Sequence, residues 1–292
     1  MKKLLVLGIV AVALVLFACS QSPDVTGPDN EQVTTGWVER PQFVDTRPLA
    51  EIFNSTRQAT SEYFEKKPVN DPPDTVTGDP NPNPPHKYAY IVGISDYEGT
   101  ANDLQYCDED ALAIRDYLQT QGFTIRMDLD AAATADNIQA GLTWLMNSCQ
   151  PGDEIAFSYS GHGAKAPTYG SSLISADLYY LTHGWVMQYI NGANCTKISV
   201  TLDCCVAADF HYDVTDGTML ATASTNSSSY DWPPFEHGAW TYFWLQAVED
   251  EGMIYAEDAA TYAETEMRLW GKDYRLKVTA AHTDRYVGEL DI

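Results

Sequence analysis

The stretch Glu154-Ile-Ala-Phe-Ser-Tyr-Ser-Gly-His-Gly163 contains a predicted strand followed directly by a candidate functional residue. Residues 154–160 predict a buried strand, and His162 follows it between two glycines. Glycines allow a substrate or a neighbouring backbone to approach closely, and the Gly163 N–H can point at a developing oxyanion. The pattern therefore predicts a functional imidazole where this strand ends.

Strands and helices alternate on both sides of this stretch. Between Leu104 and Leu118, for example, apolar residues recur at the spacing of one helical face. Such alternation predicts one α/β domain with a mostly parallel sheet covered by helices on both faces. The predicted strands are 88–94, 123–129, 154–160, 197–203, 219–224 and 275–280, and the predicted helices are 104–118, 133–146, 237–248 and 255–270.

A second set of candidate functional residues, Cys204-Cys205, directly follows the predicted strand 197–203. Working residues in parallel sheets sit beyond the carboxyl ends of the strands, so we expect His162 and this pair across one cleft. A cysteine peptidase needs a thiolate, an imidazole and backbone N–H donors. Neighbouring strand residues point to opposite faces, so only one of the two cysteines faces the cleft. The alternative is that the cysteines and the Gly-His-Gly are structural.

The N-terminus has the pattern of an export signal. Two lysines precede an apolar stretch at residues 4–17, which is shorter than the roughly 20 residues of a membrane-spanning helix. The stretch ends in Leu16-Phe-Ala-Cys19, which resembles the lipobox of bacterial lipoproteins. This resemblance implies a lipoprotein signal peptide at residues 1–18 and a lipid on Cys19. Because Ser20 is not the Asp that retains lipoproteins at the inner membrane, we expect the chain to be anchored in the outer membrane, on its periplasmic side or at the cell surface. A plain signal peptide is the alternative.

Residues 19–86 are expected to form a tether after the lipidated cysteine. Six prolines lie between Asn70 and His86 and favour an extended, semi-rigid spacer. A single helix within residues 48–64, packed on the domain, is also conceivable. The folded domain is predicted to begin at residue 87.

Charge and cysteine counts narrow the function classes. The 41 acidic residues against 17 basic ones give a net charge of -24, so nucleic acid is a poor partner. With Cys19 lipidated, five of the six cysteines remain. An odd number leaves at least one free thiol in an oxidising compartment, and a reactive cysteine is a natural candidate. The pairing of the others, Cys107, Cys149, Cys195 and Cys204, stays open.

Ser160-Gly-His-Gly163, followed about forty residues later by Asp203-Cys-Cys205, resembles the caspase and metacaspase-like cysteine peptidases. The resemblance implies a caspase-like three-layer α/β/α sandwich, with Cys205 as nucleophile and His162 as base. The N–H groups of Gly163 and Cys205 are then expected to bind the oxyanion. Further stretches that carry the resemblance are Ala89–Tyr97, Leu104–Asp110, Met219–Ser224 and His237–Thr241.

The same resemblance implies that Asp110, Ser160 and Asp203 line the pocket for the residue before the scissile bond. In metacaspase-like members such acids select Arg or Lys. Two points from the residues agree: Asp203 and Cys205 share strand parity, and Asp110 borders the apolar stripe of its helix. A carboxylate in that position is expected to be partly buried and to need a partner. The alternative is a solvated acid at Asp110 and a strand-end cap at Asp203.

The sequence also departs from the family pattern. Val206-Ala-Ala208 follows the nucleophile where the family usually has a polar or basic residue, Ser and Gly. Residues 164–176 contain no acid, so calcium activation is not carried over, and the other histidines lack paired metal-ligand spacing. We therefore expect no metal and no cofactor.

Together these observations predict a lipid-anchored, extracytoplasmic cysteine endopeptidase with a Cys-His dyad, acting on peptides or proteins after Arg or Lys. It would contact the membrane through its N-terminal lipid. One rival is a catalytically weak or inactive caspase-like lipoprotein that serves as a binding or scaffold module. A second is a hydrolase of the same broad clan with an acyl-transfer role.

Overall fold

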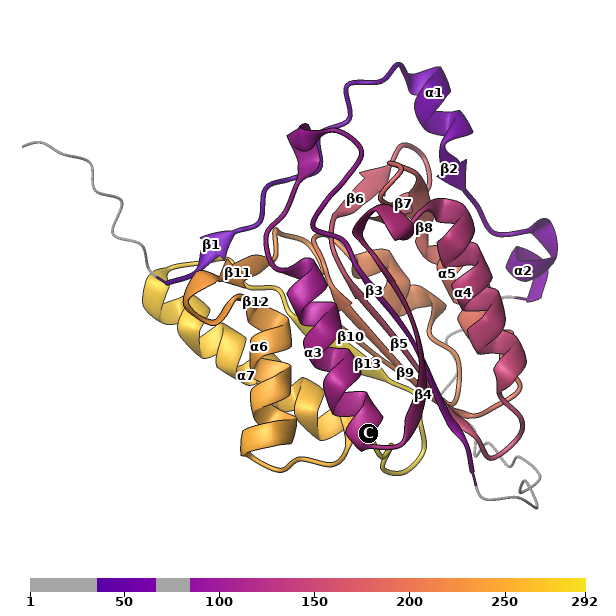
Figure 1. Cartoon of the computed structure of the whole chain (residues 1–292). Helices are drawn as coiled ribbons and strands as arrows, with labels where there is room; N and C mark the ends of the chain where they lie inside the picture. Colours follow the sequence, from indigo (N-terminus) through magenta and orange to yellow (C-terminus); the bar gives the residue numbers. More distant parts are fainter. Residues whose placement is uncertain (1–35, 67–84) are drawn as a thin grey trace, which may run out of the picture. The chain divides into compact units, whose positions relative to one another are not determined.

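The computed structural model of the chain describes residues 36–66 and 85–292. These described residues belong to one compact unit. Its centre is a sheet of six strands in the order β13-β10-β9-β5-β3-β4, in which only β13 runs antiparallel to its neighbour (Figure 1). These strands are Lys87–Gly93 (β3), Phe123–Leu129 (β4), Glu154–Ser160 (β5), Lys197–Asp203 (β9), Thr218–Thr222 (β10) and Ala281–Asp284 (β13).

Helices cover both faces of this sheet. In Figure 1, α3, α6 and α7 lie on one face and α4 and α5 on the other, so the predicted three-layer α/β/α architecture is confirmed. The helices are Cys107–Thr120 (α3), Ala135–Ser148 (α4), His183–Ile190 (α5), Ala239–Leu245 (α6), which a π-helical turn Gln246–Asp250 (η5) continues, and Ala256–Tyr274 (α7).

Strand β3 shows why its sequence is apolar throughout. Ala89 and Ile91 pack into the core under α3 and α6, while Tyr90 and Val92 pack into the core under α4. All four side chains are fully buried. A parallel strand covered on both faces needs apolar residues at every position, because neither side contacts water.

Two small sheets flank the carboxyl ends of the central strands. One has the order β2-β8-β7-β6 and the other the order β1-β11-β12. Their strands are Val38–Glu39 (β1), Thr56–Arg57 (β2), Gly163–Ala166 (β6), Gly170–Ile174 (β7), Tyr180–Thr182 (β8), Tyr230–Trp232 (β11) and His237–Gly238 (β12).

The N-terminal segment differs from the expected tether. Residues 36–66 add one strand to each small sheet and bury Trp37, Arg40 and Ile52. They contain two short helices, Leu49–Asn54 (α1) and Ser61–Lys66 (α2), in place of the single helix considered from the sequence. The compact unit therefore begins well before residue 87. The signal peptide, Cys19 and the proline-rich run lie outside the described residues.

The C-terminal strand also differs from its prediction. Residues 275–280 were expected to form it, whereas β13 occupies Ala281–Asp284 at the antiparallel edge of the sheet. Its sequence, Ala-His-Thr-Asp, lacks an apolar run, and its side chains are half-buried or exposed, so the strand could not be recognised by a buried apolar pattern. Among the helices of the described residues, none is long and apolar enough to cross a membrane.

Candidate active site

The sheet brings His162 and Cys205 to the same edge. Strands β5 and β9 are parallel neighbours, and their last residues, Ser160 and Asp203, lie opposite each other. His162 and Cys205 each follow two residues later, so both leave the sheet at its carboxyl edge. Gly163 packs on the backbone of Cys205: a Cβ there would lie 2.0 Å from the Cys205 carbonyl oxygen. Only glycine permits this approach.

Cys205 faces the site and Cys204 faces the core. Cys204 is fully buried among apolar side chains. The Sγ of Cys205 accepts a hydrogen bond from the Ser229 N–H at 3.2 Å and lies 3.6 Å from the Ser229 hydroxyl. Burial raises the pKa of Cys205, and the bonds from Ser229 only partly oppose that rise. The side chain is therefore a thiol rather than a thiolate in this state.

His162 is held as a neutral imidazole. Its Nε2 lies 2.8 Å from the carbonyl oxygen of Asn102, and a carbonyl can only accept. Nε2 therefore carries the proton, and Nδ1 keeps a free lone pair. The Tyr97 hydroxyl accepts from the His162 backbone N–H at 2.8 Å, and the two rings lie 4.9 Å apart. Burial lowers the pKa of His162 to about 4, so the imidazole is neutral near pH 7.

The three predicted pocket residues meet beside Cys205. Ser160 donates its hydroxyl to Asp110 at 2.7 Å, and Asp203 lies at the neighbouring strand end. Asp110, Ser160 and Asp203 are at most 3% exposed, so the expectation that Asp110 is buried and partnered is confirmed. Asp231 on β11 joins them. We call Asp110, Ser160, Asp203 and Asp231 the acid pocket.

The acid pocket contains a guanidinium from the chain itself. Arg40 is 1% exposed. Its Nη2 lies 3.1 Å from Asp110 Oδ2, its Nη1 lies 3.2 Å from Asp203 Oδ1, and its Nε donates to Asp231 Oδ1 at 2.5 Å. Nη1 also donates to the Asp203 carbonyl oxygen at 2.6 Å. Arg40 thus reaches three carboxylates with a planar, multidentate group.

Backbone and hydroxyl donors hold the carboxylates in place. Asp110 Oδ1 accepts from the Gly238 N–H at 2.9 Å, and Asp203 Oδ2 accepts from the N–H and hydroxyl of Thr241 at 3.1 and 2.9 Å. A Cβ on Gly238 would lie 2.3 Å from both Arg40 Nη2 and Asp203 Oδ2, so glycine is required at the wall of the pocket. The start of α6 and β12 therefore completes the acid pocket.

The charges in the acid pocket do not cancel. Three buried carboxylates face one guanidinium and the imidazole of His237, whose Nδ1 lies 3.0 Å from Asp110 Oδ1. Although burial opposes it, the carboxylate of Asp110 raises the pKa of His237. Burial, together with the charges of Asp110 and Asp231, raises the pKa of Asp203 to about 6 despite the opposing charge of Arg40. Burial likewise raises the pKa of Asp231. A buried carboxylate without a cation is costly, so this pocket requires a positively charged occupant.

Several residues of this site escaped the sequence analysis. Ser229, Asn102 and Tyr97 contact the predicted residues Cys205 and His162. Arg40 fills the acid pocket from the segment assigned to the tether, and Asp231 contacts Arg40. Asp231 and Ser229 lie in a serine-rich stretch with no motif. Their roles follow from strand pairing between β1 and β11, which local sequence patterns do not reveal.

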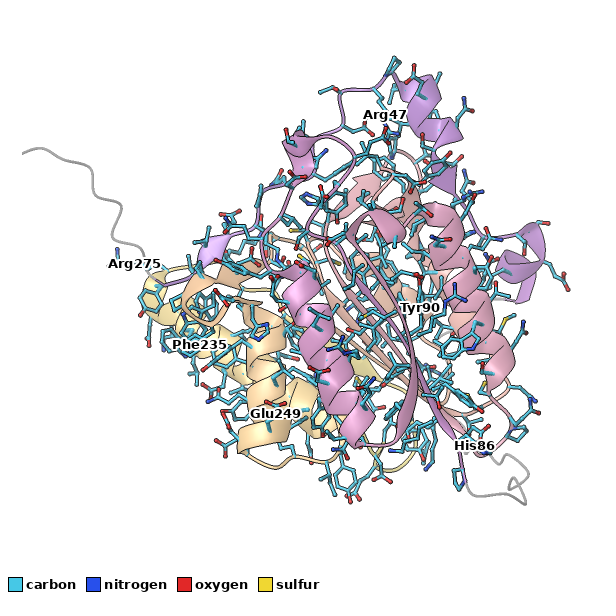
Figure 2. The ribbon with its side chains drawn as sticks, viewed as in Figure 1. Arg47, His86, Tyr90, Phe235, Glu249 and Arg275 are labelled. Carbon is cyan, nitrogen blue, oxygen red and sulfur yellow. The ribbon has the colours of Figure 1, made fainter. Side chains whose placement is uncertain are left out.

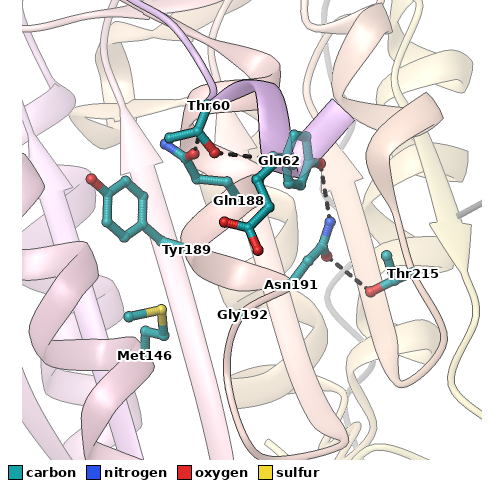
Figure 3. A pocket seen from close by; sticks show the side chains of 9 residues that line it. Thr60, Glu62, Met146, Gln188, Tyr189, Asn191, Gly192 and Thr215 are labelled. Carbon is teal, nitrogen blue, oxygen red and sulfur yellow. Dashed lines mark hydrogen bonds between the residues drawn. The ribbon is translucent and has the colours of Figure 1, made fainter. Parts of the chain in front are cut away.

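Two of the pockets in the structure are candidates for the site of the chemistry. One of about 260 Å³ lies at Cys205, where Gly163, Cys205 and Ser228 meet Gln42 and Phe43. A larger one, of about 610 Å³, lies between α2, α4 and α5 (Figure 3). Its polar wall includes Asn191, which accepts from the Thr215 hydroxyl at 2.9 Å. We assign the chemistry to the smaller pocket, because Cys205 lines it and Gly163, the neighbour of His162 in the chain, lines it too. Within the described residues, no group of three or more His, Cys, Asp or Glu could hold a metal ion.

The caspase domain profile matches residues 86–268, more than half of the chain. This chain belongs to the caspase domain family. The matching model describes a peptidase domain, which agrees with the predicted enzyme class. The profile spans β3 to α7 and includes His162 and Cys205.

Individual relatives agree with this assignment. Metacaspase-1 of Mycosarcoma maydis is 31% identical over 87 residues, which cover 27% of this chain and 21% of that protein. Metacaspase-2 of Arabidopsis thaliana is 37% identical over 94 residues, which cover 28% and 22%. The chain thus spans about a fifth of the length of these relatives. The crystal structure of protein GSU0716 from Geobacter sulfurreducens has a TM-score of 0.55 and 15% identity, over 71% of this chain and 97% of that one, which shows a shared fold.

Proposed function

We propose that this chain is a cysteine endopeptidase that cleaves after Arg or Lys, with Cys205 as nucleophile and His162 as general base and acid. One observation supports the specificity most directly: the carboxylates beside Cys205 surround a buried guanidinium. A substrate Arg or Lys side chain would take the place of Arg40. An acidic side chain would add a fourth negative charge to the same buried site, which is strongly unfavourable.

In the first half of the reaction, the Sγ of Cys205 attacks the substrate carbonyl carbon while its proton moves to Nδ1 of His162. The N–H groups of Gly163 and Cys205 are proposed to bind the oxyanion. The sheet supports this role for Gly163. Since the Ile174 N–H donates to the His162 carbonyl oxygen at 3.1 Å, the next pair, Gly163 and Leu173, is the non-hydrogen-bonded one. The Gly163 N–H therefore points away from β7.

In the second half, His162 gives its proton to the leaving amine as the carbon–nitrogen bond breaks, and a thioester to Cys205 remains. His162 then takes a proton from water, whose oxygen attacks the thioester carbon. Collapse of that intermediate breaks the carbon–sulfur bond, releases the acid product and restores the thiol. The neutral imidazole with a free Nδ1 is the protonation state that both steps need.

Fluorogenic peptides with Arg, Lys or Asp before the scissile bond test the proposal. They are incubated with the full chain and with its Arg40→Ala variant, in which the acid pocket is vacant. We expect hydrolysis of the Arg and Lys peptides only, and its loss when Cys205→Ala is added to Arg40→Ala. Equal hydrolysis with and without Cys205 would contradict the proposal.

A binding or scaffold role is the second candidate, supported by the left-handed backbone of Val206, with φ of 47°, directly after the nucleophile. A β-branched residue is strained in this conformation, and strain there alters the turn that presents Cys205. Labelling separates the candidates. An arginyl peptide with an electrophilic carbon should modify Cys205 of the Arg40→Ala variant if the site is catalytic. An unmodified thiol would favour the scaffold.

We further propose that the enzyme is anchored through a lipid on Cys19 and works outside the cytoplasm, in the bacterial envelope. The support is the sequence at residues 1–19 alone. Metabolic labelling with an alkyne fatty acid tests this directly. Wild type should carry the label and sediment with membranes, whereas Cys19→Ser should be unlabelled. Label on the Cys19→Ser chain would contradict the anchor.

A further inference from the structure

The segment from Trp37 to Arg40 is bound as an added strand. Val38 and Glu39 form β1, which pairs antiparallel with β11 through the partners Asp231 and Tyr230 (Figure 1). The pairing continues past the strand, since the Arg40 N–H donates to the Ser229 carbonyl oxygen at 3.0 Å. Addition of an extended peptide to a strand edge is a common mode of peptide recognition. Ser229 also donates its own N–H to Cys205 Sγ, so the register of this pairing is tied to the nucleophile.

Two side chains of the segment are buried and two are not. Arg40 fills the acid pocket, and Trp37 is 4% exposed, whereas Val38 and Glu39 are exposed. Trp37 packs into a set of rings that we call the aromatic cluster. Its ring lies 5.9 Å from those of Tyr230, Trp232 and Phe243 and stacks at 6.1 Å on Trp270.

The aromatic cluster continues beyond Trp37. Phe235, labelled in Figure 2, lies 4.9 Å from the Trp232 ring and 4.5 Å from the Tyr242 ring. Rings on β11, α6 and α7 therefore surround the site from several sides. A large flat side chain suits such a site, because ring pairs at these separations attract beyond simple burial.

We infer that residues 37–40 occupy the binding site of a peptide substrate, so that the enzyme selects an aromatic residue three positions before the basic one. This inference rests on the proposed function. It assigns the aromatic cluster as the site for the fourth residue before the scissile bond. The same segment then acts as a competitive occupant, and a substrate must displace it.

Residue 41 explains why the occupant can persist beside the nucleophile. Cleavage after Arg40 would form a thioester to Cys205 and expel the nitrogen of Pro41, which must receive the proton from His162. In proline the ring Cδ replaces the amide hydrogen and crowds one side of this nitrogen. Acid approach to the leaving group is therefore hindered.

The residues after Pro41 are also held in place. Val44 donates its N–H to the Asn102 side-chain oxygen at 2.9 Å and accepts from the Asn102 amide at 3.1 Å. The Phe43 ring lies 5.6 Å from that of His162. An expelled amine would stay next to the thioester, so re-formation of the peptide bond would compete with hydrolysis and slow the net cleavage. Asn102 holds both the segment and the imidazole: its side chain binds Val44, and its carbonyl oxygen accepts from His162.

Binding tests the assignment without requiring catalysis. Fluorescein-labelled Trp-Val-Glu-Arg and Ala-Val-Glu-Arg peptides are titrated onto the Arg40→Ala/Cys205→Ala chain and followed by anisotropy. We expect the Trp peptide to bind at least about tenfold more tightly. Addition of Trp270→Ala should reduce that ratio below about threefold, with little effect on the Ala peptide. Equal affinity of the two peptides would overturn the inference.

Peptide hydrolysis by variants that retain Cys205 tests whether residues 37–40 compete with substrate. Relative to wild type, kcat/KM for an Arg peptide should rise about tenfold in Trp37→Ala and in Arg40→Ala, because each removes one anchor of the occupant. Val38→Ala, at an exposed position of the same strand, is the matched control and should change kcat/KM by less than about twofold. An equal rise in the control would overturn the inference. Because Arg40→Ala leaves the carboxylates without a cation, Trp37→Ala provides a second variant with intact charge, and circular dichroism monitors folding of both.

The register has its own test. Pro41→Ala should permit self-cleavage after Arg40, seen as two fragments by intact-mass spectrometry, while Pro41→Ala/Cys205→Ala stays whole. If Arg40→Ala hydrolyses Arg peptides but Pro41→Ala is not cut and Trp37→Ala gains nothing, the inference fails and the proposed function stands. If Arg40→Ala is inert and its Cys205 unlabelled, the proposed function fails, and the peptide affinities alone decide the binding assignment.

Discussion

Cys205 is surrounded by groups that keep it protonated in this state. Its burial raises the thiol pKa, and His162 is neutral, so no imidazolium is present to stabilise a thiolate. The ion pair that activates many cysteine peptidases is therefore absent among the described residues while Arg40 fills the acid pocket. Activation then requires that the proton pass to His162 during attack, or that departure of the segment changes both groups.

Iodoacetamide measures this directly, since it reacts with thiolates. We expect alkylation of wild-type Cys205 to be slow near pH 7.5 and to rise about tenfold per pH unit up to about pH 9, because the thiol pKa lies above its usual value of about 8.5. Cys107, which is fully buried, serves as the internal control and should remain unlabelled throughout. A plateau below about pH 8 would show a stabilised thiolate and contradict the prediction.

His211 makes the fold sensitive to acid. Its two ring nitrogens contact the hydroxyls of Thr283 and Thr222 at 2.8 and 3.0 Å, which ties β10 to β13. Burial lowers its pKa to about 4, whereas an unfolded histidine titrates near 6.5. The unfolded state therefore takes up the proton first. The stabilisation is complete above about pH 6.5 and is lost as the pH falls toward about 4.

Urea unfolding of wild type and His211→Asn checks this. At pH 7 the variant should be less stable because it loses one or both hydroxyl contacts. Between about pH 7 and pH 4.5 the difference should shrink by about 2 kcal/mol, since only wild type loses stability through this group. Burial also raises the pKa values of Asp203 and Glu154. Their titration changes the free energy of unfolding of both proteins equally, so it cancels in the difference between wild type and variant. A difference independent of pH would contradict the assignment.

Single residues also show how far the sequence could predict the site. His162, Asp110 and Asp203 stand at the ends or edges of regular elements, where parity and strand order place them. Arg40 lies 191 positions from its partner Asp231, and nothing in either neighbourhood marks the contact. The pair follows from how β1 adds to β11, which is a tertiary property. Local pattern therefore predicts the candidate site residues but not the occupant of the acid pocket.

At the scale of elements, α4 and the loop before β9 meet through two thiols. Cys149 is the C-cap of α4, and it shares a hydrogen bond with Cys195 that lowers the pKa of Cys149 and raises that of Cys195. Both are free and buried in the structure. Adjacent thiols of this kind form a disulfide readily when an oxidant is present, because the lower-pKa partner supplies the attacking thiolate.

Oxidised glutathione should therefore link Cys149 to Cys195 and no other pair. The crosslink should stabilise the chain by about 2–4 kcal/mol, since it restricts the unfolded state. Peptide mapping without reduction identifies the pair, and thermal unfolding with and without reductant measures the gain. Cys149→Ser is the control and should show no redox dependence. A disulfide through Cys205 or Cys107 would contradict the prediction.

The elements that the sequence failed to predict share a physical property. The four interior strands of the parallel sheet are buried on both faces, and their apolar runs predicted their positions closely. By contrast, β6, β7 and β8 form a small sheet at the edge of the site and β13 is a polar edge strand, so their residues carry little periodicity. Helix α5 has only eight residues. Such short elements are specified by the packing around them rather than by their own pattern.

For the whole molecule, the negative charge bears on the encounter with substrate. Residues 87–292 carry 30 acidic and 10 basic residues, a net charge of -20. Such a field draws cationic peptides toward the protein and raises the rate of association, while the chemistry at Cys205 is unaffected. A proposed preference for Arg or Lys beside the scissile bond and an acidic domain would then act in the same direction.

Salt separates this long-range effect from the acid pocket. Two peptides share Trp-Val-Glu-Arg before the scissile bond and carry either three lysines or three glutamates after it. With the Arg40→Ala chain, kcat/KM for the lysine peptide should fall several-fold between about 20 and 300 mM NaCl, because screening shortens the reach of the field. For the glutamate peptide it should rise, and kcat should stay constant for both. If kcat/KM depends on salt in the same way for both peptides, the prediction of a long-range effect is contradicted. The electrostatic selection would then arise entirely in the acid pocket, because both peptides present the same Arg to that pocket.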